Sequence, residues 1–254
     1  GSCICNHIYL QIKKMISKII DNIKTLTIAL IIAILIRSFL FQPFYIPSSS
    51  MEPTLLVGDR IFVSKYTYGY SKHSFPFSPP ILNKRIFYSK PNYGDLIVFK
   101  TPSDNRTDFI KRLIGLPGDE IQIIKGVLFI NKKKILRTKI SDRSDIRCAG
   151  YEQDVFEFKE ELPNKKIHVA VYKKEGTMLN TDVYIVPEKH YFFLGDNRDC
   201  SSDSRFLSNV GYVHENNLVG KARIIFFSND TKKGSFLKFW NWKNSIRFNR
   251  FFKS

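Results

Sequence analysis

The hydrophobic residues of this chain follow two different spacings. From Thr25 to Phe41 they form one long run that a charge interrupts only at Arg37, and residues 28–36 are all apolar. This is close to the lower limit of the roughly 17 to 25 residues that span a bilayer. A buried helix of a soluble protein would carry a polar stripe, and a cleaved signal peptide would need small residues at a cut site. The run therefore predicts one retained transmembrane helix over residues 25–42.

Beyond Pro43 the pattern changes to short runs of β-branched and aromatic residues, separated by Gly, Pro, Asn and Asp. Such runs predict strands; they cover residues 60–64, 95–100, 109–114, 120–124, 127–131, 133–136, 167–172, 182–186, 191–194 and 221–227. We expect a mainly β fold: an antiparallel sheet core over residues 43–125 and 189–230, with a smaller β subdomain inserted at 126–188. Residues 231–254 form a basic, aromatic tail that suits either the bilayer interface or packing against the sheet.

The charges along the chain predict its orientation in the membrane and argue against a nucleic-acid partner. The chain has 40 Lys and Arg against 23 Asp and Glu, a net charge of +17, but the lysines are scattered over its whole length. We therefore expect no nucleic-acid partner. Positive residues are retained on the cytoplasmic side of a membrane, and four lysines precede the apolar run whereas only Arg37 follows it closely. Residues 1–24 are predicted to be cytoplasmic, although 1–14 start Gly-Ser without Met and are set aside as a non-native leader.

The four cysteines do not predict a metal site. Cys3 and Cys5 are separated by one residue, and no second pair has metal-ligand spacing. Cys148 and Cys200 could bridge only if the fold brought them together, so we expect free thiols.

Three serines, Ser48, Ser49 and Ser50, lie between Pro47 and Pro53. Proline restricts the backbone, so these hydroxyls are expected on a constrained turn. By composition alone the segment could also be a polar linker.

Lys111 lies in a predicted strand where alternation puts it on the same face as Phe109. A lysine that loses its water has a lowered pKa, and when neutral it can accept a proton from a serine. A surface lysine beside Arg112 is the ordinary alternative.

A third cluster, residues 195–205, is dense in Gly, Asp, Asn and Ser and follows the strand at 191–194. This composition predicts a rigid loop held by side-chain to backbone hydrogen bonds. It is unlike a calcium loop, because Arg198 and Arg205 add positive charge and the Gly and Glu spacing of an EF-hand is absent. No metal or cofactor is expected.

In this order, behind an N-terminal anchor, the clusters resemble bacterial type I signal peptidase, a Ser/Lys serine peptidase. The resemblance covers about residues 37–227 and rests on four motifs at residues 47–55, 93–99, 110–119 and 195–199. The sequence departs from the longest family members between about residues 126 and 188, and at Cys200, where the match often has Asn.

The resemblance implies a role for each matching residue. Ser50 is the nucleophile and Lys111 its general base. Ser48 donates to the oxyanion together with the backbone N–H of Ser50, and Ser201 orients the lysine amine. Two supporting ion pairs are implied, Asp203 with Arg205 and Asp196 with Arg112. The substrate would bind as an added β-strand with small residues at the first and third positions before the cut. The implied pocket walls, which could equally be ordinary core, are Phe44, Ile46, Met51, Leu55, Val98, Phe109 and Ile110.

The sequence thus predicts a membrane-anchored endopeptidase that removes signal peptides from exported preproteins. It would lie on the outer (periplasmic) face of the cytoplasmic membrane, with signal peptides and the lipid bilayer as partners. A self-cleaving repressor would need a DNA-binding head where this chain has an apolar run, and an organellar inner-membrane peptidase differs mainly by compartment. The alternative from another class is a catalytically inactive, membrane-anchored protein that binds preproteins.

Overall fold

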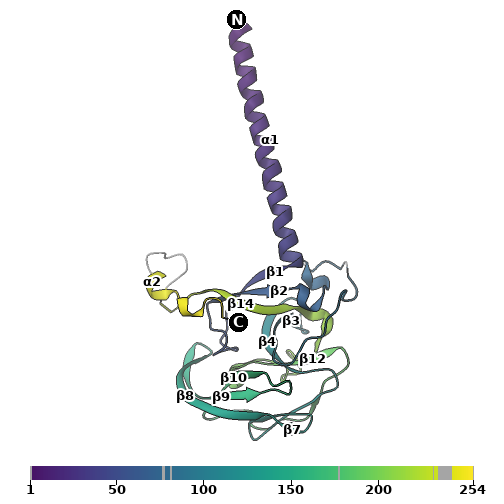
Figure 1. The fold of residues 1–254 in the computed structure, drawn as a ribbon, viewed down its shortest axis with the longest axis vertical. Helices are drawn as coiled ribbons and strands as arrows, with labels where there is room; N and C mark the ends of the chain where they lie inside the picture. Colours follow the sequence, from purple (N-terminus) through teal and green to yellow (C-terminus); the bar gives the residue numbers. More distant parts are fainter. Residues whose placement is uncertain are drawn as a thin grey trace.

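The computed structural model describes residues 2–75, 78–80, 82–176, 178–230, 232–233 and 242–253. Helix α1 runs from Ser2 to Phe39 and projects away from the β domain (Figure 1). Its part from Lys13 to Phe39, 27 residues, is long and apolar enough to cross a membrane, and its most apolar window is not buried by the rest of the chain. The helix begins before the predicted span and ends at Phe39, because the chain turns into a strand two residues later.

The largest sheet holds seven strands, all paired antiparallel, which confirms the mainly antiparallel β fold. In spatial order they are β1 (Phe41–Tyr45), β2 (Asp59–Ser64), β14 (Leu218–Ser228), β3 (Leu96–Lys100), β4 (Asp108–Gly115), β12 (His190–Leu194) and β13 (Val213–His214). Strand β1 is an edge strand and lies at the foot of α1 (Figure 1). An edge tolerates Pro43, which lacks a backbone N–H for the ladder.

Two smaller sheets are built mainly from residues 126–188, the segment expected to be an inserted β subdomain. One has the order β11 (Tyr184–Ile185), β5 (Glu120–Ile124), β6 (Val127–Ile130) and β7 (Lys133–Lys134). The other has the order β10 (Ile167–Lys173), β9 (Tyr151–Glu161) and β8 (Leu136–Cys148). Strands β8 and β9, the longest hairpin of the chain, were not expected from the sequence.

Short helices complete the fold, and the end of the chain returns to the large sheet. The helices are η1 (Tyr66–Tyr68), η2 (Lys72–Ser74), η3 (Arg198–Cys200), η4 (Glu215–Asn217), α2 (Trp242–Ser245) and η6 (Phe248–Arg250). The backbone N–H of Phe252 donates to Ile225 O at 2.7 Å, and Arg250 forms an ion pair with the buried Asp59 at 2.6 Å. Of the two expectations for the tail, residues 246–253 follow packing against the sheet, whereas 234–241 lie outside the described residues.

Apolar packing on both faces holds β3 and β4 in place. On one face Phe99 stacks on Phe193 with ring centroids 4.6 Å apart. On the other, Val98 packs with Met51 and Leu55 from the loop between β1 and β2. Burying each such side chain contributes about 1.5 to 3 kcal/mol. The core therefore fixes the strand that carries Lys111 and the loop that carries Ser50 against each other.

Candidate active site

Lys111 lies in the middle of β4, opposite Ile97 of the neighbouring strand β3. Its side chain is almost fully buried, at 4% exposure. The Nζ atom lies 5.4 Å from the ring centroid of Phe109, so the two side chains share a face as the alternation predicted. The amine is thus removed from bulk water.

Ser50 is presented by the turn between β1 and β2 and is 7% exposed. Its Oγ is hydrogen-bonded to Lys111 Nζ, across 61 positions of sequence. The Oγ of Ser48 lies 3.3 Å from Ser50 Oγ, and Ser48 is itself exposed. The turn therefore places two hydroxyls beside one buried amine.

The surroundings of Lys111 disfavour its charged form. Burial lowers the pKa of Lys111 from 10.5 to about 8, because the ammonium loses its hydration. The carboxylates of Asp203 and Asp196 act in the opposite direction, and Arg205 adds to the lowering. An amine with a pKa near 8 is partly neutral at physiological pH and can accept a proton from a hydroxyl.

Both supporting ion pairs that the sequence suggested are formed. Arg112 contacts Asp196 through two hydrogen bonds, Nε to Oδ1 at 2.7 Å and Nη2 to Oδ2 at 2.6 Å. Thr54, from the same loop as Ser50, donates to Asp196 Oδ2 at 2.6 Å. Burial raises the pKa of Asp196, but the charge of Arg112 and its hydrogen bonds outweigh this, so the pKa stays below its usual value. The pair thereby ties β4, the turn and residues 195–205 together.

The second pair, Asp203 with Arg205, stabilises the loop from within. Arg205 Nε donates to Asp203 Oδ1 at 2.8 Å, and the backbone N–H of Gly195 donates to Asp203 Oδ2 at 3.0 Å. A Cβ at Gly195 would collide with Ser50 O and Ser201 Oγ. Glycine is therefore what lets the loop approach the serine turn.

Ser201 lies in this loop, but it does not form the hydrogen bond to Lys111 that the family resemblance implies. It is 6% exposed, and its Oγ has no hydrogen-bond partner among the residues that the structure describes. The expected hydrogen bond from Ser201 to Lys111 is therefore not formed in this structure.

Asn197 and Glu52 were not singled out from the sequence, although each contacts the site. The Asn197 side-chain amide donates to Ser49 O at 3.1 Å and to Arg147 O at 2.8 Å, and its backbone N–H donates to Ser50 O at 3.1 Å. Glu52 accepts from the backbone N–H of Arg147 at 2.8 Å, and burial raises its pKa. No sequence signal marks these contacts, because they depend on where strand β8 ends.

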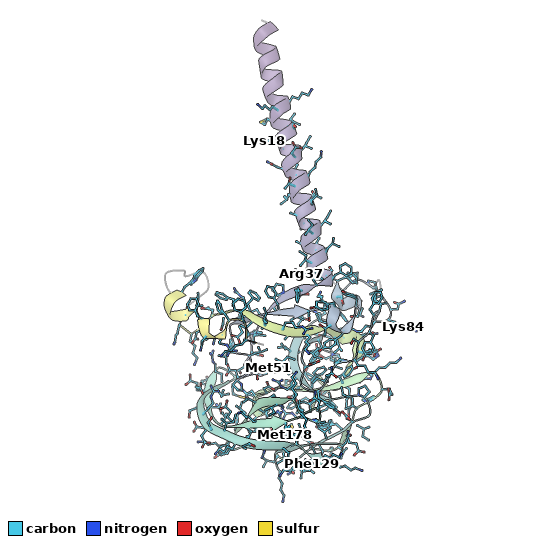
Figure 2. The ribbon with its side chains drawn as sticks, viewed as in Figure 1. Lys18, Arg37, Met51, Lys84, Phe129 and Met178 are labelled. Carbon is cyan, nitrogen blue, oxygen red and sulfur yellow. A yellow bond between two sulfur atoms is a disulfide. The ribbon has the colours of Figure 1, made fainter. Side chains whose placement is uncertain are left out.

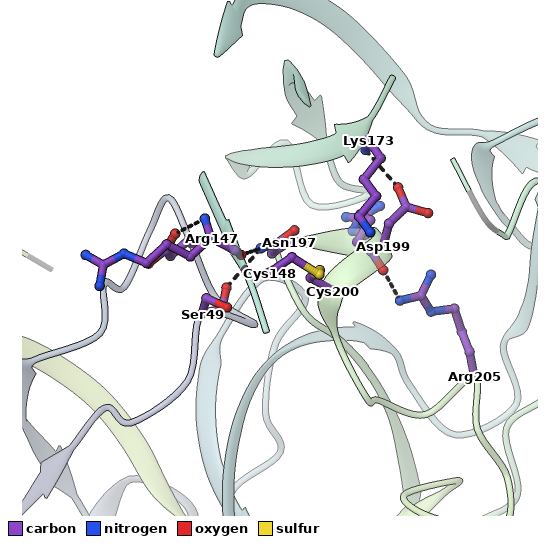
Figure 3. Close-up of a disulfide and its surroundings, with 10 residues drawn as sticks. Ser49, Arg147, Cys148, Lys173, Asn197, Asp199, Cys200 and Arg205 are labelled. Carbon is purple, nitrogen blue, oxygen red and sulfur yellow. Dashed lines mark hydrogen bonds and ion pairs between the residues drawn. A yellow bond between two sulfur atoms is a disulfide. The ribbon is translucent and has the colours of Figure 1, made fainter. Parts of the chain in front are cut away.

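Cys148 and Cys200 form a disulfide, with Cα atoms 5.5 Å apart, so the expectation of free thiols was wrong (Figure 3). Cys148 is the last residue of β8 and Cys200 the last of η3. The unexpected β8–β9 hairpin is what brings two cysteines together across a sequence separation of 52. The bridge joins this hairpin to the loop that carries Ser201.

A cavity of about 390 Å³ opens beside Ser50 and Lys111. Six of the seven predicted wall residues line it, namely Phe44, Ile46, Met51, Val98, Phe109 and Ile110, and Ser48 and Cys200 also contribute. Leu55 packs into the core with Met51 and is not among the lining residues. Within the described part of the chain, no group of three or more His, Cys, Asp or Glu residues could hold a metal ion.

Comparison with known proteins identifies the family of this chain. The family model for signal peptidase, peptidase S26, matches residues 19–227. The chain belongs to the S26 signal peptidase family. It is 43% identical to signal peptidase I of Rickettsia conorii over 242 residues, 88% of each chain, and 41% identical to that of Rickettsia canadensis over 249 residues, 91% of each. A crystal structure of a signal peptidase I from Enterococcus faecalis is 28% identical and covers 52% of this chain and 97% of its own, with a TM-score of 0.30.

Membership confirms the resemblance that the motifs indicated. This signal peptidase homologue is a serine endopeptidase of the S26 type that acts in signal peptide processing. The inactive binding protein considered from the sequence alone is therefore not supported.

Proposed function

We propose that Ser50 is the nucleophile of this peptidase and Lys111 its general base. The observation that carries the proposal is the hydrogen bond between Lys111 Nζ and Ser50 Oγ in a buried site. Ser50 Oγ attacks the substrate carbonyl while neutral Lys111 takes its proton, passes it to the leaving amine and then activates water. The Ser48 hydroxyl and the Ser50 backbone N–H stabilise the oxyanion.

The substrate is the signal peptide of an exported preprotein, bound as an extended strand. The cavity beside Ser50 is small and mostly apolar in its lining, which suits small side chains at the first and third positions before the cut. Ser201 supports the dyad by orienting the amine once substrate has closed the site, because its Oγ is buried nearby without a partner.

The anchor helix crosses the cytoplasmic membrane once, with residues 1–24 in the cytoplasm, 25–42 in the bilayer and the β domain outside. The lysines before the apolar run favour this direction. The Cys148–Cys200 disulfide supports it independently, since disulfides persist in oxidising compartments such as the periplasm. Outside the membrane, residues 43–125 and 189–230 form the catalytic core, 126–188 the inserted subdomain and 231–254 the tail.

Cleavage of a preprotein by purified variants tests the dyad. Ser50→Ala and Lys111→Ala should each abolish product on a gel. Ser49→Ala, the same change one residue away, and Lys132→Ala, whose side chain is 85% exposed, should cleave at the wild-type rate. Undiminished cleavage by either dyad variant contradicts the proposal, and activity lost on adding a chelator would indicate a metal enzyme instead.

A further inference from the structure

A basic cavity of about 430 Å³ lies at the end of the anchor helix, apart from the Ser50–Lys111 contact. Arg37, in the last turn of α1, is one of its walls and is labelled at the foot of the helix in Figure 2. The other cations that line it are Lys72 of η2, Lys100 of β3 and Arg106 of the turn before β4. The cavity therefore gathers four positive side chains from four segments at the membrane end of the domain.

Two carboxylates also line the cavity, but local partners already occupy them. Asp108 forms an ion pair with Lys100 at 2.9 Å. Asp104 accepts from Thr101 Oγ1 at 2.5 Å and from the backbone N–H of Arg106 at 2.8 Å. The side chains of Arg37, Lys72 and Arg106 make no hydrogen bond or ion pair with any residue that the structure describes. Arg37, Lys72 and Arg106 thus face the cavity without a direct partner among the described residues, and four cations against two carboxylates leave its lining a net charge of +2.

A buried imidazole with an unpaired ring nitrogen is a second indication that the cavity binds an anion. His73 lines the cavity and is 4% exposed; its Nδ1 is 2.9 Å from Ser78 Oγ, and its Nε2 has no hydrogen-bond partner in the described part of the chain. Burial and then the charges of Lys72 and Lys100 lower the pKa of His73 to about 4, so the ring is neutral. In the tautomer in which the Ser78 hydroxyl donates to Nδ1, the Nε2 atom carries the proton and is available as a donor.

An apolar hollow of about 890 Å³ shares Arg37 with this basic cavity but lies on the other face of β1. Its walls come from the last turns of α1 and from the outer faces of β1, β2 and β14, and include Ala33, Ile36, Phe41, Phe62 and Ile224. A cationic cavity and an apolar hollow that meet only at Arg37, at the foot of a membrane helix, match an amphipathic ligand with a negative head and a hydrocarbon tail.

We propose that these two cavities together bind one anionic phospholipid, with its phosphate among Arg37, Lys72, Arg106 and His73 Nε2 and an acyl chain that passes Arg37 into the apolar hollow. The proposal rests on the proposed membrane anchoring, because Arg37 belongs to the anchor helix. A bound lipid would fix the domain relative to the bilayer beside the cavity that contains Ser50, since Phe44 and Asp108 line both cavities.

Lipid titration of the full chain in neutral detergent, read by native mass spectrometry, tests the site. Wild type should retain phosphatidylglycerol in preference to phosphatidylcholine. Lys72→Gln/Arg106→Gln should bind phosphatidylglycerol about thirtyfold more weakly, because the variant loses two cations that each attract the lipid phosphate. The charge-matched control Lys84→Gln/Lys132→Gln removes two exposed lysines elsewhere and should stay within about twofold of wild type.

Each other outcome overturns the proposal. Equal retention of the two lipids, or equal losses in both double variants, leaves no specific site. Inorganic phosphate that displaces phosphatidylglycerol and binds as tightly would assign a free-anion site instead of a lipid site. Cleavage of a soluble peptide by the same samples, together with flotation on vesicles, separates failure of this site from failure of the dyad or of the anchor.

Discussion

At the scale of single residues, the proposed role of Lys111 predicts how activity depends on pH. Burial lowers its pKa to about 8, so only about one tenth of the molecules hold a neutral amine at pH 7. We predict that kcat/KM for a soluble peptide rises about tenfold per pH unit below pH 8 and levels off above it. Initial rates across this range check the prediction, and a profile flat between about pH 6 and pH 8 would contradict it.

The same lowered pKa means that Lys111 destabilises the folded state. In the unfolded chain the Lys111 amine keeps its proton up to about pH 10.5, whereas in the folded protein the amine releases the proton near pH 8. The unfolded state therefore binds more protons in that window, and the free energy of unfolding should rise with pH through it. Lys111→Met keeps the volume without the charge, so at pH 7 it should stabilise the fold by on the order of 1 to 3 kcal/mol while abolishing cleavage.

Urea denaturation of wild type and Lys111→Met measures this difference. Wild type should approach the variant in stability as the pH rises from 8 to 10.5, because the penalty disappears only when the unfolded amine is neutral as well. A variant clearly less stable than wild type at pH 7 would mean that the ammonium is well solvated.

At the scale of elements, the predicted strands are those whose side chains pack on a core. β3 and β4 were recognisable because Val98, Phe99 and Leu113 are buried. β8 and β9 were missed because their cross-strand contacts are polar: Arg143 pairs with Glu157 at 3.0 Å, and most of β8 is exposed. β9 has a short alternation at Phe156 and Phe158 but β8 has none, so the pattern did not predict the hairpin or the disulfide that depends on it.

The loop of residues 195–205 depends on glycine for its approach to the serine turn. Gly195→Ala places a Cβ against Ser50 O and Ser201 Oγ, so the turn must shift. A displacement of about 1 Å can cost a hundredfold in rate, and we predict a loss of that order in kcat. Gly176→Ala is the matched control, because a Cβ there meets only ordinary contacts, at 3.4 Å and beyond. Equal rates for the two variants would show that the loop can move freely.

The disulfide should stabilise the same loop from its other end. Closing a separation of 52 residues is worth about 2 to 4 kcal/mol. Cys148→Ser/Cys200→Ser should therefore lower the melting temperature and also the cleavage rate, since Cys200 lines the cavity beside Ser50. Reductant should do the same to wild type and nothing to the double variant. If reductant left the melting temperature and the cleavage rate of wild type unchanged, the disulfide would contribute nothing to the site.

At the scale of the whole molecule, the sequence indicated the family and candidate site residues but not how the distant segments contact one another. Ser50 and Lys111 are 61 positions apart, and only their resemblance to a known family linked them before the fold was seen. Asn197 joins the serine turn, the 195–205 loop and β8, three segments distant in sequence. Such a residue has no local pattern, because its role arises only when the sheets are assembled.

The whole molecule also carries an asymmetry that predicts its orientation. Lys13, Lys14, Lys18 and Lys24 precede the apolar part of α1, and the disulfide lies in the domain beyond it. Protease added outside cells with a permeabilised outer membrane should digest the β domain and spare the N-terminal segment, while a cytoplasmic marker stays intact. Changing the four lysines to Gln should let a fraction of the chains insert in reverse. In those chains the two cysteines would face a reducing compartment and should react with a thiol reagent. If external protease left the β domain of wild type intact, the charge bias would not determine the topology.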